Sequence, residues 1–210
     1  MTNDTLVFNS IATSTSRVVQ YTIELCEASP IECIKYENRS IFSKLCKDGC
    51  KNYDRKWCCP PHSPGFSTLA QPWEKLYVVF LHIPMDGFSD VKNSYLRVKA
   101  ANSMLKSRAD KFVRIVSKNN GRAISTGSCR LCKPCHFQKG EPCAHPRLMA
   151  YSFEALGINV NAMVTDLFTV PLQWYKTGVM PEYTSVVCGV LTNSSFSLDD
   201  LHDIYLKNIL

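Results

Sequence analysis

The sequence predicts an α/β fold: a mixed sheet with flanking helices and two cysteine-rich, metal-binding loop inserts. Three observations lead to this class. The apolar run LYVVFLHI, which begins at Leu76, has the length of a buried strand. Residues 90–117 carry an apolar stripe with the period of a long helix. Most of the eleven cysteines fall in two short stretches of the 210-residue chain. We expect residues 1–210 to form a single domain that contains both cysteine-rich segments, 46–61 and 127–147.

The long helix is predicted to run from about Asp90 to Ser117. Its apolar residues recur at spacings of three, four or seven, so that they share one face. Ser89 or Asp90 can cap its beginning, and Asn119-Asn120-Gly121 suits its end. The predicted stripe consists of Val91, Tyr95, Val98, Leu105, Ala109, Phe112 and Val116. The opposite face is a solvated surface, or a docking surface for an acidic redox partner or a nucleic acid, and carries Lys92, Lys99, Lys106, Lys111 and Arg114.

Further short elements are predicted in the last third of the chain. Residues 146–156 are expected to form a helix, because Pro146 suits a first turn and Gly157 suits a C-terminal cap. INVNAMV (158–164) and YTSVVCGVL (183–191) are expected to be strands. Residues 198–209 are expected to form a closing helix.

The late cysteine-rich segment, 127–147, carries four thiols: Cys129, Cys132, Cys135 and Cys143. Three thiols at C-x2-C spacing are typical of the loops that surround a cubane in bacterial ferredoxins. Tetrahedral zinc usually takes two separated two-cysteine hooks instead. A bend at Gly140 and Pro142 would return Cys143 to the same cluster. The spacing therefore predicts one [4Fe–4S] cluster on these four cysteines, with zinc as the alternative.

Two neighbouring features bear on this predicted cluster. A helix beginning at Pro146 would turn its free amide groups and partial positive charge toward an anionic cluster. His136 and His145 are either substitute ligands or loop histidines that form hydrogen bonds nearby.

The early cysteine-rich segment, 46–61, carries Cys46, Cys50 and the adjacent pair Cys58-Cys59. Adjacent side chains point in different directions, so Cys58 and Cys59 are not expected to bind one metal together. Cys59 is the better ligand, because Pro60-Pro61 restricts the backbone beyond it. Cys58 is then a spare thiol, a replacement ligand or a core residue.

The expected early ligands, Cys46, Cys50 and Cys59, have no fourth member in the local sequence. A second cubane held by three cysteines would leave one iron open to a substrate or water, as in open catalytic zinc sites. The alternative is a structural metal with a distant fourth ligand, drawn from Cys26, Cys33, Cys188 and His62. Otherwise Cys26, Cys33 and Cys188 are expected to be buried small hydrophobes.

Composition indicates the setting. No apolar run approaches the ~18 residues of a membrane span, and the N-terminal MTNDTLVFNS lacks the layout of a secretory signal. We therefore expect a soluble cytoplasmic protein without a membrane anchor, in which clustered cysteines are metal ligands rather than disulfides. The formal net charge of +6 omits anionic clusters, so it does not by itself indicate nucleic-acid binding.

Three motifs of this sequence carry a family resemblance. They comprise Cys46, Cys50, Tyr53, Trp57, Cys59, Pro60 and Pro61; Cys129, Cys132, Cys135, Cys143 and Pro146; and Tyr151, Ser152, Glu154, Ala155 and Gly157. Together they resemble an uncharacterised family of predicted metal-binding proteins, a domain of unknown function common in anaerobic bacteria and archaea. The resemblance covers about residues 46–160 and implies metal binding, but it names no reaction. Cys58 departs from the pattern, which has a small polar residue there.

Iron–sulfur electron transfer is the leading functional hypothesis. The sequence has no G-x-G-x-x-G motif and no Walker loop, so the electrons would come from a redox partner. One alternative is an enzyme of desulfidase, dehydratase or reductase type that binds substrate at an open iron. Glu154 is then the candidate acid or base, although it can equally be a helix carboxylate paired with Arg147 or solvent. The other alternative is a zinc-stabilised interaction module.

Overall fold

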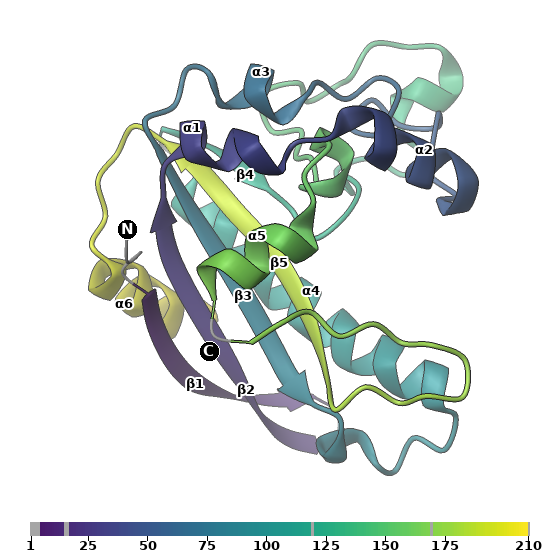
Figure 1. Cartoon of the computed structure of the whole chain (residues 1–210), viewed down its shortest axis with the longest axis vertical. Coiled ribbons are helices and arrows are strands. Elements are labelled where there is room, and N and C mark those ends of the chain that lie inside the picture. The colour runs from purple at the N-terminus through teal and green to yellow at the C-terminus, as the bar shows by residue number, and fades with distance from the viewer. Residues whose placement is uncertain (1–4, 15–16, 119, 169, 210) are drawn as a thin grey trace.

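A computed structural model describes residues 5–14, 17–118, 120–168 and 170–209. The described residues form a five-stranded sheet in the order β1-β2-β3-β5-β4 (Figure 1). Its strands are β1 (Thr5–Ser14), β2 (Arg17–Ala28), β3 (Lys75–Pro84), β4 (Gly121–Ile124) and β5 (Tyr183–Thr192). All four strand pairs are antiparallel. None of the described helices has the length and hydropathy that crossing a membrane requires.

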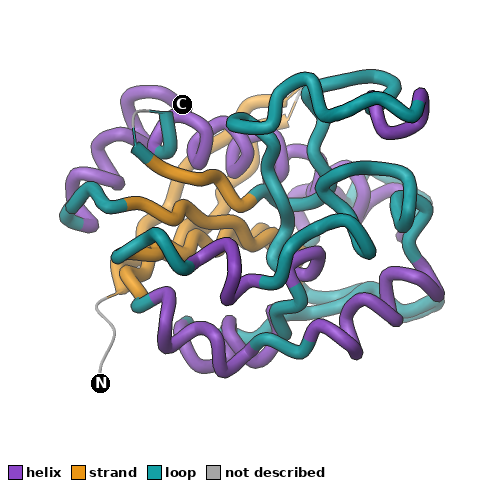
Figure 2. Tube along the Cα trace, turned by 90° about the horizontal axis from the view of Figure 1, so that it is seen from above, coloured by secondary structure: helices purple, strands orange, loops and turns teal. Residues whose placement is uncertain are grey.

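Six α-helices accompany the sheet in the described parts of the chain. They are α1 (Pro30–Cys33), α2 (Arg39–Gly49), α3 (Phe66–Ala70), α4 (Ser94–Val116), α5 (Val160–Leu167) and α6 (Leu198–Ile209). Short 3-10 turns are η1 (Ile34–Tyr36), η2 (Asp86–Phe88), η3 (His136–Lys139) and η4 (Glu154–Leu156). Helices α4 and α6 pack on one face of the sheet, and α1, α3 and α5 on the other (Figure 1). Loops gather at one end of the molecule, beyond the strands (Figure 2).

Strand β3 is the centre of the hydrophobic core, and it confirms the strand predicted from Leu76. Its side chains alternate between the two faces, as the period of two requires. Tyr77 and Leu81 face α4 and α6, whereas Val78 and Phe80 face the layer that contains α3 and α5. Because helices or loops cover both faces, the strand is apolar on both sides.

The predicted long helix is confirmed as α4, with a later beginning than expected. The side chain of Asn93 caps it by accepting a hydrogen bond from Leu96 N, 3.0 Å away, so the caps predicted at Ser89 or Asp90 are wrong. Val91 precedes the helix and Tyr95 is 53% exposed, so the stripe is buried only further along. Of the predicted stop signal, Asn119 lies outside the described residues. The buried face consists of Ala101, Met104, Leu105, Ala109, Phe112, Val113 and Val116.

Other predictions had mixed outcomes. Strand β5 and helix α6 are confirmed, as is the α/β class with flanking helices. The mixed sheet is wrong, because β1 and β2 form a hairpin and β5 runs antiparallel to both of its neighbours. Parallel pairing among the described residues is limited to an isolated bridge between Ile124 and Tyr151.

Two elements after residue 145 differ in type from the prediction. Residues 146–156 do not form the expected helix. Tyr151 instead lies beside the end of β4, where the amide of Ser125 donates a hydrogen bond to the carbonyl oxygen of Tyr151 at 2.7 Å. A helix replaces the strand predicted at 158–164, since Asn159 caps α5 through Ala162 N and the helix buries its apolar residues at a helical period.

Candidate metal centre

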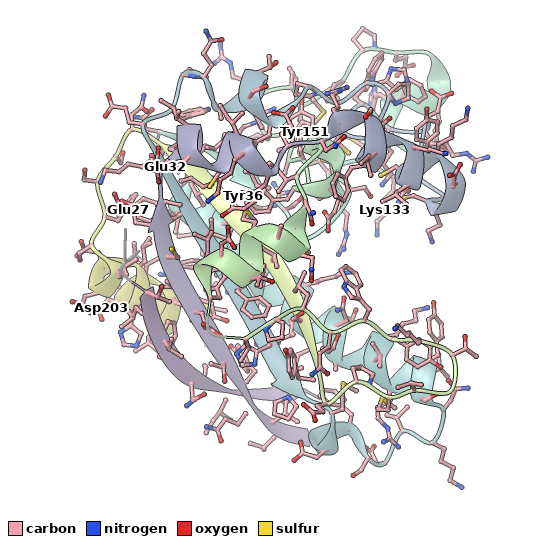
Figure 3. All side chains as sticks on the ribbon, viewed as in Figure 1. Glu27, Glu32, Tyr36, Lys133, Tyr151 and Asp203 are labelled. Atoms are coloured by element: carbon pink, nitrogen blue, oxygen red, sulfur yellow. The ribbon has the colours of Figure 1, made fainter. Side chains whose placement is uncertain are left out.

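The two cysteine-rich segments, far apart in the sequence, lie against each other. The amide of Cys129 donates a hydrogen bond to Cys58 Sγ at 3.1 Å. The ammonium group of Lys56 donates to Ser128 Oγ at 3.1 Å and to the carbonyl oxygen of Cys129 at 3.0 Å. Figure 3 labels Tyr151 and Lys133 at the same end of the molecule as α2. The sequence pattern did not predict this contact, because no local spacing encodes it.

Aromatic side chains extend the contact between the segments. Trp57 Nε1 donates to the carbonyl oxygen of Glu141 at 3.0 Å, and the Trp57 and Phe137 rings meet edge-on with centroids 4.9 Å apart. The His62 ring lies 4.6 Å from that of Phe137. The early segment therefore supports the late segment from one side.

The late thiol group consists of the four predicted cysteines, Cys129, Cys132, Cys135 and Cys143. All four are partly buried and line one cavity of about 20 Å³. Burial raises the pKa of Cys132, and the neighbouring thiols of Cys135, Cys129 and Cys143 raise it further. The fold thus gathers the four sulfurs that the spacing had predicted as one ligand set.

The four thiols of the late group are suitable metal ligands, but they would have to change position to hold a cluster. Four thiols are the donor set of iron–sulfur clusters and of structural zinc. No three His, Cys, Asp or Glu side chains within the described ranges are close enough together to hold a single ion. The cavity has room for about one water molecule. The thiols must therefore move outward to receive a cluster. The late segment that carries them consists of turns and the short 3-10 turn η3.

Helix α4 anchors the beginning of the late segment. Asp110 accepts hydrogen bonds from the amide of Thr126 at 2.9 Å and from its hydroxyl at 3.0 Å. The guanidinium group of Arg130 lies 4.0 Å from the same carboxylate. The helix predicted at Pro146 is absent from this part of the chain, so it does not supply the N-terminus that was expected to face the thiols.

The early thiol group consists of Cys46, Cys50 and Cys59. Cys46 lies in the last turn of α2, and Cys50 caps that helix by donating its amide hydrogen to Cys46 O at 2.9 Å. Burial raises the pKa of Cys46, and Cys50 and Glu154 add to the effect. The pKa of Cys59 is also raised, by its contact with Cys58, by burial and by Cys50. Cys50 thus contributes to the raised pKa of both Cys46 and Cys59. Cys50 is exposed, whereas Cys59 is buried.

Cys58 and Cys59 are adjacent in the sequence, and their Sγ atoms lie 3.8 Å apart, so the two side chains do not point away from each other as expected. Cys58 is 1% exposed and lines the cavity of the late thiol group. Its contact with Cys59, the amide of Cys129 and the charge of Lys56 lower its pKa to about 7. Cys58 is thus a fifth sulfur beside the late group, and it also contacts Cys59 of the predicted early group.

The other predicted ligand candidates lie elsewhere. His62 pairs with Asp54 at 2.7 Å, and His136 pairs with Glu141 at 2.8 Å. His145 lines the late cavity and stays a candidate there. The prediction that Cys26, Cys33 and Cys188 are buried is confirmed, and Cys188 lies on the opposite face of the sheet, beside α4.

Glu154 is exposed and begins the 3-10 turn η4, which packs against α2. Gly157 makes this close packing feasible: its φ of 90° suits glycine, and a Cβ there would come within 3.0 Å of Arg39 Cα. The charge of Glu154 acts on both Cys46 and Lys106. The candidate acid or base therefore lies between the early thiol group and helix α4.

Sequence reasoning missed the polar residues that position the thiols. Lys56 and Asp110 gave no motif, because each acts on a segment distant in the sequence. Lys106 was expected on a solvated face, yet it is partly buried. The spacing of Lys106 from the buried positions Ala109 and Val113, three and seven residues further along, was the available signal.

An α/β fold in which two adjoining segments present eight thiols defines a class of cysteine-rich, metal-binding protein. This chain belongs to the family described as predicted metal-binding protein (DUF2284), whose model matches residues 28–191. The family resemblance seen in the sequence is thereby confirmed. No curated protein and no solved structure matches the chain significantly.

Proposed function

We propose that this chain is a cytoplasmic iron–sulfur protein of one domain, and that its late thiol group holds a [4Fe–4S] cluster for electron transfer. The observation that carries the proposal is the convergence of Cys129, Cys132, Cys135 and Cys143 on one cavity. When bound, such a cluster supplies one-electron chemistry. Reduced thiols of this kind persist in the cytoplasm.

The spacing of the thiols favours a cluster over zinc. Four thiolates around one zinc ion stand about 3.8 Å apart, given a Zn–S bond of about 2.3 Å and tetrahedral geometry. A cubane gives each thiolate its own iron, so the sulfurs stand further apart. Cys129, Cys132 and Cys135 follow one another at C-x2-C spacing, which is typical of a cubane, whereas zinc usually takes two separated two-cysteine hooks.

The charges of the late segment support an acidic redox partner. Arg130, Lys133 and Lys139 are exposed around the late thiol group. Positive charge beside a redox centre steers acidic partners toward it and raises association rates at low ionic strength.

Iron and sulfide analysis after purification without oxygen tests the proposal. The wild type is expected to be brown, and Cys132→Ala is expected to lose about four iron and four sulfide per chain. Cys33→Ala is the matched control, since it removes a buried thiol outside both groups. A colourless protein with stoichiometric zinc would contradict the proposal and favour a zinc-stabilised interaction module.

A second candidate function rests on the early thiol group. Cys46, Cys50 and Cys59 neighbour one another, Cys50 is exposed, and Cys58 faces the other group. A second cluster on these three thiols would have an iron open to substrate, with Glu154 close by as the candidate acid or base. The wild type would then carry about twice the iron of Cys50→Ala, and a small added thiolate would change the wild-type spectrum only. A fourth protein ligand on that iron would contradict this enzymatic reading.

A further inference from the structure

A cavity of about 360 Å³ lies between helix α4, strand β5 and residues 172–175. This volume is within the range of small-molecule sites. It is separate from both thiol groups, and neither the family nor the proposed electron transfer assigns it a role. Its polar and aromatic lining includes Tyr95, Asn102, Lys106, Glu154, Trp174 and Tyr175.

Aromatic rings form the outer part of this cavity. Trp174 is 64% exposed, and Tyr95 is 53% exposed at the beginning of α4. The Tyr95 and Tyr175 rings lie 5.9 Å apart, and the Tyr175 hydroxyl is 3.0 Å from Ser94 Oγ, which ties the 172–175 segment to α4. Exposed rings around a hollow offer stacking surface to a flat apolar molecule.

Lys106 supplies positive charge to the inner part of the cavity. It is partly buried, and its ammonium group makes no hydrogen bond or ion pair within 4.0 Å to another residue in the described ranges. Burial lowers its pKa, and the nearby charge of Arg130 lowers it further, against the opposite effect of Glu154 and Asp110. A buried charge without a close partner is costly, so an anion placed against this ammonium would be stabilised.

The two walls of the cavity formed by α4 and β5 are joined by hydrogen bonds. The amide nitrogen of Asn102 donates to Thr184 Oγ1 and to Ser185 O, each at 3.1 Å. These bonds link α4 to β5 along the cavity, so that the site is largely formed before a ligand arrives.

We infer that this cavity binds a small organic carboxylate with a flat apolar body. Lys106 holds the carboxylate, and the rings of Tyr95, Trp174 and Tyr175 hold the body.

Calorimetry with 3-phenylpropionate and its neutral amide tests this inference on the whole protein. The wild type is expected to bind the carboxylate at least about tenfold more tightly than the amide, as one charge-assisted hydrogen bond implies. Lys106→Met should remove this preference, and Lys111→Met, an exposed position on the same helix, should preserve it. Trp174→Ala should weaken the binding of both probes alike.

Equal affinity of the wild type for the two probes would overturn the inference, as would no binding of either. A preference that persists in Lys106→Met would overturn the assignment of the carboxylate to Lys106. If Lys106→Met fails to fold, the comparison of the two probes on the wild type decides by itself. Iron content is not a readout here, so failure of this inference is distinguishable from failure of the iron–sulfur proposal.

Discussion

The early and late thiol groups are built in different ways. The early group takes Cys46 and Cys50 from the end of helix α2 and Cys59 from a buried position, so regular structure and the core hold it. The late group takes all four thiols from a loop in which η3 is the single short helical turn. Its position depends on contacts with its neighbours, chiefly Cys58, Lys56 and Asp110.

The two groups differ in opposite senses in the number of their thiols and in the regular structure that holds them. The late group has the complete set of four thiols but little regular structure, so a bound metal would add much of its order. The early group has three thiols on a more ordered frame. A rigid, incomplete set suits a site that exchanges ligands, whereas a flexible, complete set suits a closed centre.

The largest expected effect follows metal removal. Stripping the metal should speed tryptic cleavage after Arg130 and Lys139 by on the order of a thousandfold, the effect of about 4 kcal/mol on a local opening equilibrium. Cleavage after Lys44 and Lys51 should change less, because α2 remains. Far-UV circular dichroism should be largely retained, since the sheet and α4 bury their own apolar surface. Collapse of the helical signal would show instead that folding and metal binding are one event.

The next effect is that of Cys58→Ala in the metal-free protein. The change leaves the Cys129 amide without its sulfur acceptor and opens a small cavity, which should cost about 2–4 kcal/mol of unfolding free energy in urea. Cleavage after Arg130 should rise as well. Cys33→Ala also truncates a buried thiol, yet it should leave that cleavage unchanged. Equal cleavage in the two variants would contradict the inference that Cys58 stabilises the late group in particular.

Asp110→Ala should have a smaller effect that is again confined to the late segment. The loss of two hydrogen bonds to a carboxylate should cost about 1.5–3 kcal/mol, and Asp110→Asn should restore part of it. Hydrogen exchange at the Thr126 amide measures the local opening. Asp166→Ala is the control, because Asp166 is bound to Tyr36 far from the loop. Faster exchange in that control would mean that the effect is general.

The last effect appears only at alkaline pH and concerns a thiol outside both groups. Burial raises the pKa of Cys33 from 9.0 to about 12. Above pH 9 the unfolded chain loses this proton and the folded chain keeps it, so the unfolding free energy falls by up to about 1.4 kcal/mol per pH unit until about pH 12. Urea titrations from pH 8 to 10.5 should show a shallower decline in Cys33→Ala. Identical slopes would contradict the assignment of this thiol to the core.

Some of the fold was predictable because its signals are local. The apolar run of β3 and the helical stripe of α4 have the periods of their elements, and α6 and β5 follow the same rule. The β1–β2 hairpin was missed, although Tyr21, Ile23 and Leu25 alternate with polar residues and could have indicated β2. Helix α5 was taken for a strand, because a short apolar run fits both periods until the Asn159 cap is considered.

The sequence by itself predicted which thiols form each group, since C-x2-C and C-x3-C spacings limit how far apart neighbouring sulfurs can lie. It also predicted Cys59 as the early ligand, through the restricted backbone that follows it. Tertiary structure alone decided that Cys58 faces the late loop, that Lys56 and Asp110 position that loop, and that Lys106 and Trp174 share a cavity. These relations join residues between about 15 and 80 positions apart, and contacts at such separations depend on how the sheet and its helices pack, which no local pattern specifies.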